Sequence, residues 1–271
     1  MNNNLDQYYT NPTIAQVCMN TIYDIVDIDT IDVVVEPSAG TGSFFNLMDA
    51  SKSIGMDLDP KYPNVIAQDY FSFAPITDMT YIVIGNPPFG KNSSLAIKFF
   101  NHSEYAQYIG FVVPKTFRKK SVQNRLDPMF HLIHDNPMPK DSFIFEGKPY
   151  DVPCCFQIWE KRDYRREKHL IKTQHTDFDF VNDLADTDFI IQRVGANAGA
   201  VKVDNLSKWK KPSHYYIKAN IDKNKLVEIF NNISFEEVKY NTAGNPSISK
   251  DELIELYELN IIPLILNSLL Y

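Results

Sequence analysis

The sequence predicts an α/β protein built on a mainly parallel, doubly wound sheet, followed by a smaller C-terminal region. Short apolar runs rich in β-branched residues alternate with segments of helical periodicity over residues 1–165. A glycine-containing turn directly follows the first of these runs, and polar residues close the next three. The ends of such strands meet at one edge of the sheet, so a functional site is expected there.

The first elements set this pattern. Residues 12–26 have apolar side chains at helical spacing, with Thr10 and Asn11 where a helix cap is expected and Pro12 in the first turn. The run 31–35 reads as a buried strand, and 43–50 as a helix after the turn.

Later segments continue the alternation. Four further strands are expected at 53–59, 65–70, 79–89 and 108–114, a helix at 93–102, and more strand-like runs within 128–160. Residues 166–271 are expected to form a small separate region of short strands, with a helix near 223–232 and two closing helices, 249–259 and 261–271.

Composition limits the class of protein. The chain is 44% hydrophobic and 23% charged, and it has neither a long apolar run nor a signal-like N-terminus, so we expect a cytoplasmic protein that does not enter membranes. Its three cysteines, Cys18, Cys154 and Cys155, have no disulfide or zinc-ligand spacing, and no metal site is expected. The composition leaves the oligomeric state open.

The net charge of −7 argues against a nucleic-acid partner, but two stretches are basic. Residues 115–125 carry five Lys or Arg and no acid, and residues 202–225 carry seven lysines against two aspartates. Local charge decides where a polyanion docks, so nucleic acid remains a candidate partner.

The turn Glu36–Phe44 (EPSAGTGSF) is the first candidate for ligand binding. Gly40 and Gly42 allow a tight turn and a close backbone approach, although a purely structural turn explains them about equally well. Phe45 stands where a dinucleotide fingerprint has its third glycine, which disfavours NAD and FAD. Asp57, 21 residues after Glu36, ends the second strand, where an acid can bind ribose hydroxyls.

Asp69 and Tyr70 end the third strand in the same way. An acid can accept a hydrogen bond from an adenine amine and an aromatic ring can stack on the base, while a capping Asp before a core Tyr is the plain alternative. Together, the turn and the two acidic strand ends indicate a nucleoside cofactor.

Asn86-Pro87-Pro88-Phe89, after the fourth strand, is the decisive motif. The prolines stiffen the loop and expose carbonyl oxygens. The Asn86 side chain and the Pro87 carbonyl can accept from an aromatic amine and direct its lone pair at a methyl donor. Phe89 offers a flat face to the ring. Neither a metal nor a strong base is needed for this chemistry.

These motifs resemble those of the N6-adenine DNA methyltransferases, in their gamma-class order. Tyr8 to Pro12 resembles the leading cofactor segment, Glu36 to Phe44 the glycine motif, and Asn86 to Phe89 the catalytic tetrapeptide. The resemblance implies a Rossmann-like S-adenosylmethionine-dependent fold with a mixed seven-stranded sheet, and a site-specific enzyme of DNA methylation, as in restriction–modification.

The resemblance also implies which residues act. The catalytic set is Asn86, Pro87, Pro88 and Phe89, and the cofactor set is Tyr9, Thr10, Glu36, Pro37, Ser38, Ala39, Gly40, Gly42, Phe44, Asp57, Asp69, Tyr70 and Asn86. Phe89 replaces the commoner tyrosine or tryptophan, and the small C-terminal region implies a short or relaxed recognition sequence.

Candidate contacts to nucleic acid lie in the two basic stretches. They are Lys115, Arg118, Lys119 and Lys120, and Trp209, Lys210, Lys211 and Tyr215. A solvated basic loop and a partly buried aromatic cluster are equally good interpretations. An RNA N6-adenosine methyltransferase, a protein-glutamine methyltransferase and a catalytically silent nucleic-acid-binding subunit remain alternative functions.

Overall fold

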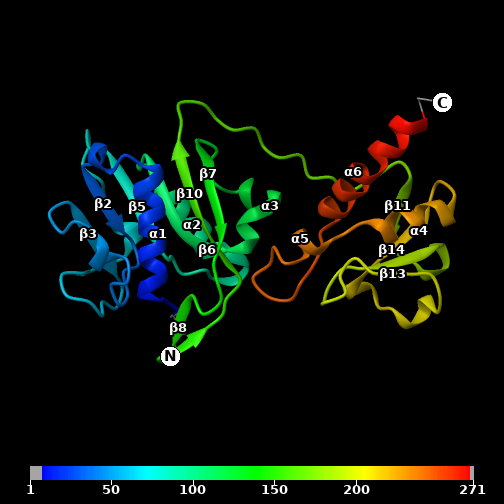
Figure 1. Cartoon of the computed structure of the whole chain (residues 1–271), viewed down its shortest axis with the longest axis horizontal. Coiled ribbons are helices and arrows are strands. Elements are labelled where there is room, and N and C mark those ends of the chain that lie inside the picture. The colour runs from blue at the N-terminus through cyan, green and yellow to red at the C-terminus, as the bar shows by residue number, and fades with distance from the viewer. Residues whose placement is uncertain (1–7, 269–271) are drawn as a thin grey trace. The chain divides into compact units, whose positions relative to one another are not determined.

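The computed structural model describes residues 8–268, with side chains described as far as Ile262, and divides into two compact units at His169. Residues up to His169 form the first unit and those from Leu170 the second (Figure 1). Each unit has its own hydrophobic core. None of the described helices is both long and apolar enough to cross a membrane.

A mainly parallel seven-stranded sheet forms the centre of the first unit, as the sequence predicts. Its order is β4-β3-β2-β5-β6-β10-β7, and β10 runs antiparallel to both of its neighbours. The strands are β2 (Val33–Glu36), β3 (Ser53–Asp57), β4 (Ile66–Ala67), β5 (Tyr81–Gly85), β6 (Tyr108–Pro114), β7 (Phe130–Pro137) and β10 (Cys154–Lys161).

The strand order contains a switch point. From β2 the chain proceeds outward through β3 and β4, and it then returns to lie on the other side of β2 as β5, next to β6. In open α/β sheets, ligands bind beyond the carboxyl ends of the strands at such a reversal. The fold therefore directs attention to the ends of β2 and β5, which are Glu36 and Gly85.

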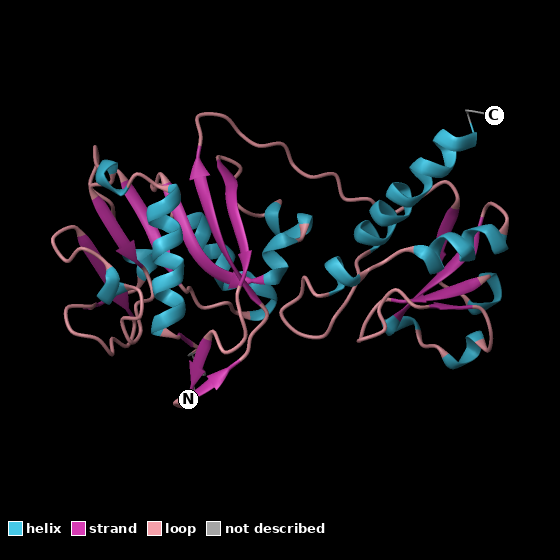
Figure 2. Ribbon diagram, in the orientation of Figure 1, coloured by secondary structure: helices cyan, strands magenta, loops and turns pink. Residues whose placement is uncertain are grey.

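Helices cover both faces of this sheet (Figure 2). One face packs against α1 (Pro12–Ile25), which begins at the Asn11 cap and buries Ala15, Cys18, Met19 and Ile22. The other face packs against α2 (Ser94–His102) and α3 (Lys120–Gln123). Successive side chains of a strand point alternately into the two cores. Because both faces of the sheet are buried, the strands appear in the sequence as continuous apolar runs.

A second, three-stranded sheet secures the start of the described chain. It consists of β1 (Tyr9–Thr10), β8 (Phe143–Phe145) and β9 (Lys148–Tyr150), with β8 in the middle. Tyr9 pairs with Ile144, and the Asn11 amide donates to the Ser142 carbonyl at 2.9 Å. The segment that precedes α1 is thus held by a hairpin more than 130 residues away in the sequence.

Two expectations for this unit are wrong in detail. Residues 43–50 are not an α-helix but a single 3-10 turn, η2 (Phe45–Leu47), because Asp49 accepts hydrogen bonds from Ser51 and turns the chain into β3. The strand expected at 65–70 is only β4, because Asp69 caps a second 3-10 turn, η3 (Tyr70–Ser72).

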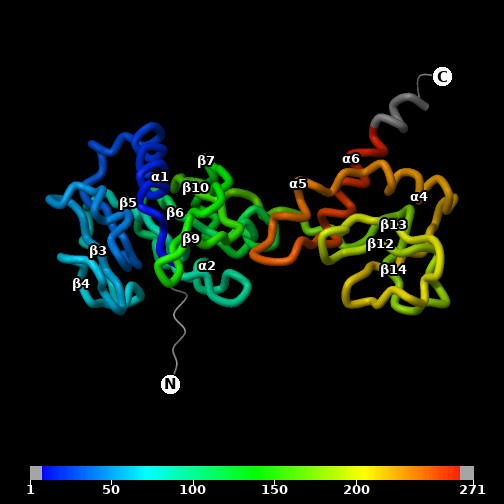
Figure 3. Tube along the Cα trace, turned by 60° about the horizontal axis from the view of Figure 1, so that its bottom comes forward, coloured from blue at the N-terminus to red at the C-terminus, as the bar shows by residue number. Residues whose placement is uncertain are grey.

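The second unit is a four-stranded antiparallel sheet with helices. The sheet order is β11-β14-β12-β13, from β11 (Phe178–Val181), β12 (Phe189–Gln192), β13 (Val201–Lys202) and β14 (His214–Ala219). The helices are α4 (Lys223–Asn232), α5 (Glu236–Lys239) and α6 (Lys250–Ser268). The two closing helices expected at 249–271 are one continuous helix, α6, as far as the chain is described. Figure 3 shows the strands of this sheet with α4 and α6 beside them.

Truncating a buried apolar side chain of the first unit should destabilise the protein more than truncating an exposed one. Phe111 on β6 is 1% exposed, whereas Ile76 in the loop before β5 is 65% exposed. We expect Phe111→Ala to lower the free energy of unfolding by about 3–5 kcal/mol and Ile76→Ala to change it by less than about 0.5 kcal/mol. Urea denaturation of both variants measures this, and equal losses would contradict the assignment of the core.

Candidate active site

A cavity of about 540 Å³ lies beyond the carboxyl ends of the parallel strands. Its volume is within the range typical of small-ligand sites. Strand ends, the turn after β2 and the segment around β1 all contribute to its wall. The lining comprises Tyr8, Tyr9, Thr10, Glu36, Pro37, Ser38, Ala39, Gly40, Thr41, Ser43, Phe44, Asp57, Leu58, Asp59, Gln68, Asp69, Tyr70, Phe71, Asn86, Pro88, Gly90, Lys91, Leu95 and Phe99. Every residue predicted for the cofactor except Gly42 is among them.

The turn after β2 owes its path to two glycines with positive φ, Gly40 at 50° and Gly42 at 81°. A Cβ atom on Gly40 would come within 2.8 Å of the Tyr9 ring, and one on Gly42 would overlap the Tyr62 ring. Gly42 therefore shapes the turn without reaching the cavity wall. Because Tyr9 fills the space over Gly40, the turn and β1 form one wall.

Asp57 is fixed in place by backbone donors. Its Oδ2 accepts from the Gly40 amide at 2.7 Å, and its Oδ1 accepts from the Asp59 amide at 2.8 Å. Each carboxylate oxygen has a further lone pair, so Asp57 can still accept hydrogen bonds from a ligand. Beside it, Leu58 is 65% exposed and offers an apolar contact within the same cavity.

Asp69 and Tyr70 have different environments. Asp69 is exposed, and its Oδ1 accepts from the Phe71 amide at 3.0 Å. Tyr70 is 2% exposed, its hydroxyl bonds Ser103, and its ring is stacked on Phe73. Tyr70 thus lines the cavity as part of the core, with little ring surface left for a base.

Phe71 is one of several residues of the cavity wall that the sequence did not predict. It lines the cavity and is 41% exposed, so it has the free ring surface that Tyr70 lacks. The only signal in the sequence is its position directly after Asp69 and Tyr70, and the capping bond from its amide to Asp69 sets its direction.

Asn86 follows β5 and has a fixed orientation. Its Nδ2 donates to the Tyr8 carbonyl at 2.8 Å, while its Oδ1 is buried and has no hydrogen-bond partner. A carbonyl can only accept, so the amide must turn its NH2 to Tyr8 and its oxygen the other way. The Asn86 main chain is held as well, because the Ser38 hydroxyl donates to its carbonyl at 3.1 Å.

The other three residues of the tetrapeptide are placed unevenly. Pro88 lines the cavity, whereas Pro87 is buried and Phe89 is half-buried outside the cavity lining. The Phe89 ring packs against both cores and meets Phe143 edge-on at 6.5 Å. The geometry brings Asn86 and Pro88 together with the cofactor residues, and the stacking role of Phe89 stays a prediction.

Two more polar atoms at this cavity are buried without partners. They are the Oγ1 of Thr10 and the Oε2 of Glu36, side chains of residues that are 3% and 2% exposed. Burial raises the pKa of Glu36 well above its ordinary value near 4.5, against the effect of a bond from the Phe45 amide. Buried polar atoms are usually hydrogen-bonded, so these two are candidates for contact with a ligand.

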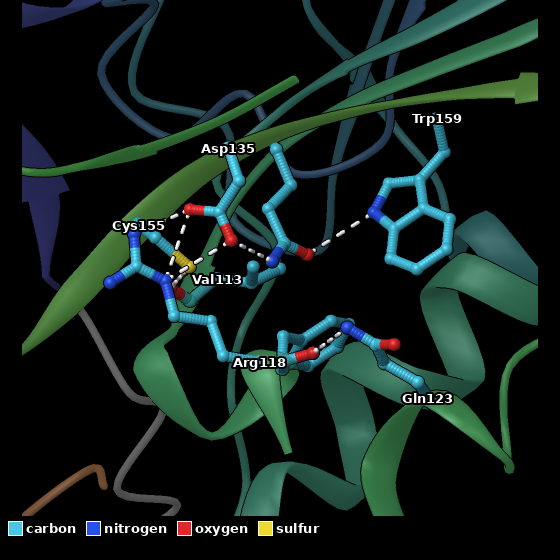
Figure 4. A network of polar contacts seen from close by, with 8 residues as sticks. Val113, Arg118, Gln123, Asp135, Cys155 and Trp159 are labelled. Atoms are coloured by element: carbon cyan, nitrogen blue, oxygen red, sulfur yellow. Dashed lines mark hydrogen bonds and ion pairs between the residues drawn. The ribbon is translucent and has the colours of Figure 1, made fainter. Parts of the chain in front are cut away.

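Arg118 is paired within the protein, and its predicted contact with phosphate stays a prediction. It lies in η5 (Lys115–Arg118), and its Nε donates to both oxygens of Asp135 at 3.0 and 3.1 Å. Gln157 donates to Asp135 at 2.9 Å and accepts from the Trp159 indole at 3.1 Å. Figure 4 shows the Arg118 guanidinium directed at Asp135, with Trp159 at the far end of this chain of bonds.

This network fixes η5 at the end of β6. The predicted contact residue Lys115 lies in the same turn and is half-buried, as are Lys119 and Lys120 just after it. Phosphate binding by these three lysines stays a prediction.

In the second unit, the structure matches the alternative of a partly buried aromatic cluster at Tyr215, and its contact with nucleic acid stays a prediction. Tyr215 is 8% exposed because β14 turns it into the core, where its hydroxyl donates to the Ile248 carbonyl at 3.0 Å. Trp209 is half-buried, with the Lys202 ammonium 5.1 Å from its ring centroid. Lys210 and Lys211 are exposed, and the Lys211 ammonium bonds Asn182.

No protein-family model matches the sequence, and no curated protein sequence is significantly similar to it. Several solved structures share part of the chain path. A "putative RNA methyltransferase" from Pyrococcus horikoshii is 21% identical, with 58% of this chain and 87% of that chain covered and a TM-score of 0.45.

Two further structures have comparable coverage. The 23S rRNA methyltransferase ErmE is 14% identical, with 58% of this chain and 71% of that chain covered and a TM-score of 0.41. A dimethyladenosine transferase from Plasmodium falciparum is 19% identical, with 57% and 63% covered and a TM-score of 0.40. With TM-scores below 0.5, these likenesses lend no weight to an activity, which has to be inferred from the cavity.

The burial of Glu36 predicts a pH-dependent stability. With its pKa raised, folded Glu36 holds its proton more tightly than the unfolded chain does, so its contribution to stability falls as pH rises above about 4.5. Glu36→Gln removes this titration and keeps an acceptor for the Phe45 amide. We expect the wild type to lose stability relative to the variant as pH rises from 5 to 8, by at most about 1.4 kcal/mol per pH unit.

Urea denaturation of both proteins at several pH values measures this difference, and the other titrating groups cancel in it. A difference that stays constant with pH would show that Glu36 titrates alike in the folded and unfolded chains.

Proposed function

We propose that this chain is an S-adenosylmethionine-dependent methyltransferase that methylates the N6 amine of adenine in DNA. The observation that carries the proposal is the Oδ1 of Asn86, a buried acceptor without a partner at the wall of a cavity suited to a nucleoside. The cavity lies at the switch point of a doubly wound sheet, where such ligands bind.

The residues present fit the cofactor. Asp57 would accept from the ribose hydroxyls and Asp69 from the adenine amine, with Leu58 and Phe71 against the base. At the other end, the cofactor's ammonium group would donate to the buried carboxyl of Glu36 and, as a nearby positive charge, would favour its ionised form. The cofactor supplies a methyl group that is already activated by its positive sulfur.

Asn86 would prepare the acceptor amine. Its Oδ1 accepts one N6 hydrogen, and the Pro87 carbonyl is the second acceptor in the motif. These bonds favour a pyramidal nitrogen whose lone pair is directed at the methyl group. Since the amide is held by Tyr8, it does not have to reorganise during the reaction. The contribution of this chain is therefore positioning and hydrogen bonding.

A polymeric substrate has to present its adenine outside a duplex. The target base would be flipped or single-stranded, and its recognition would involve the second unit, which the sequence analysis assigns to residues 166–271. DNA is proposed on the strength of the motif order. RNA with the same chemistry, a glutamine side-chain amide and a silent binding subunit are the alternatives that the assay has to separate.

The test is transfer of a labelled methyl group to adenine-containing DNA and to RNA of matched sequence. We expect label in DNA, recovered as N6-methyladenine. Asn86→Ala should reduce kcat by about 10²–10³-fold with little change in cofactor binding. The matched control is Asn20→Ala, an exposed amide on α1, which should keep full activity.

The other outcomes each point elsewhere. Label in RNA alone would replace the DNA substrate by RNA. Label in neither polymer, with cofactor binding by calorimetry, would exclude the nucleic-acid assignment, and no binding at all would indicate a silent subunit. Full activity of Asn86→Ala would contradict the role given to its oxygen.

A further inference from the structure

The segment after the catalytic loop has an unusual backbone. Gly90 has φ 66° and ψ 174°, a conformation that only glycine adopts readily, and Asn92 and Ser93 are both left-handed, at φ 54° and 60°. Two successive non-glycine residues in this region are strained and persist only where their surroundings determine them. Such strain is concentrated at functional sites, and the segment Gly90–Ser93 directly follows the catalytic loop.

Specific contacts hold this segment in place. Ser93 is 2% exposed, and its hydroxyl lies 2.7 Å from that of Thr116 in η5. At the other end, the Phe89 carbonyl accepts from the Leu95 amide at 3.1 Å and the Ala96 amide at 3.3 Å. The segment is therefore anchored on both sides, to α2 and to the turn that Arg118 secures through Asp135.

The anchored segment presents Lys91 to the cavity. Lys91 lines it and is exposed, five positions after Asn86. Among the residues that the structure describes, it is the only Lys or Arg in the lining, which also contains Glu36, Asp57, Asp59 and Asp69. No ion pair is found for Lys91 among the described residues.

We propose that the Lys91 ammonium binds a backbone phosphate beside the target nucleotide and so holds the extruded adenosine at the cavity mouth. This inference rests on the proposed function. The anion is assigned to the polymer because Lys91 is exposed, as is expected at a rim that meets a large substrate. The residues with unpaired polar atoms that are assigned to the cofactor, Thr10 and Glu36, are buried and lie on other elements, on β1 and at the end of β2.

Lys91 is thus a positioning residue that contacts the substrate away from the reacting amine. A lysine ammonium is a compact charge suited to such a contact, and each phosphate neutralised by a protein cation releases counterions. Log affinity falls as log salt rises. Removing one phosphate contact should make this negative slope shallower by about 0.9 for duplex DNA, or by about 0.7 for a single strand.

The test compares Lys91→Gln with the wild type and with Lys98→Gln, which removes an exposed lysine from α2 outside the cavity lining. We expect Lys91→Gln to weaken DNA binding about tenfold at low salt. It should also make the salt dependence of binding shallower by about 0.7–0.9 and leave the Kd for S-adenosylmethionine unchanged. Lys98→Gln should not reproduce this reduction in slope.

A second measurement locates the phosphate. DNA with one neutral methylphosphonate linkage next to the target adenine should bind the wild type more weakly, while Lys91→Gln should bind the modified and natural DNA equally well. An unchanged salt slope, or equal sensitivity of both proteins to the methylphosphonate, would overturn the inference. So would a weakened Kd for S-adenosylmethionine in place of a salt effect, because Lys91 would then bind the cofactor's carboxylate.

The two proposals fail differently. If the wild type neither binds nor methylates nucleic acid, the proposed function is lost and this inference with it. If the wild type methylates DNA and Lys91→Gln behaves like Lys98→Gln, only the inference is lost.

Discussion

The hydrogen bond from the Asn86 side chain to the Tyr8 carbonyl is the contact on which the site depends. It joins the loop after β5 to the segment before α1, and it determines which end of the amide faces away from Tyr8. Tyr8 is held by the neighbouring strand β1, which pairs with β8, and by its ring, which stacks on Tyr150. The orientation of one amide therefore depends on a long-range pairing as well as on the switch point between β2 and β5.

Several polar atoms of this arrangement have no hydrogen-bond partner within the protein. Among the described residues, seven buried side-chain N or O atoms have no partner, and three of them belong to residues lining this cavity, namely Thr10, Glu36 and Asn86. Each such atom costs about 1–3 kcal/mol. A ligand that donates hydrogen bonds to them recovers this cost, so stability lost in the free protein becomes affinity for the ligand.

The parts predicted from the sequence are those set by local pattern. The strand runs, the glycine turn, Asp57 and Asn86 follow from periodicity and from the rule that parallel strands end at one edge. The hairpin that holds β1 was not foreseeable, because a two-residue strand carries almost no periodicity and its partner is far away in the sequence. The turn to β3 ended the expected helix at 43–50 for a local reason, the Asp49 side chain.

The sequence does not determine how much of each candidate side chain is exposed. The sequence shows that aromatic and basic residues are adjacent, but in a strand neighbouring side chains face opposite sides of the sheet. Tyr215 therefore joined the core of the second unit. Arg118 pairs with Asp135, 17 residues away in the sequence. Tyr70 lines the cavity as predicted but is buried, while Phe71 beside it is exposed. Burial and pairing of this kind are decided by tertiary packing, which periodicity does not encode.

The most direct measurement of the central claim is a crystal structure of the protein with S-adenosylhomocysteine and an adenine-containing DNA. The account predicts the adenine N6 within hydrogen-bonding distance of the Asn86 Oδ1, roughly 2.7–3.2 Å, with the Asn86 Nδ2 still bonded to the Tyr8 carbonyl. An adenine bound elsewhere, or an Asn86 amide turned so that its oxygen leaves the cavity, would contradict it.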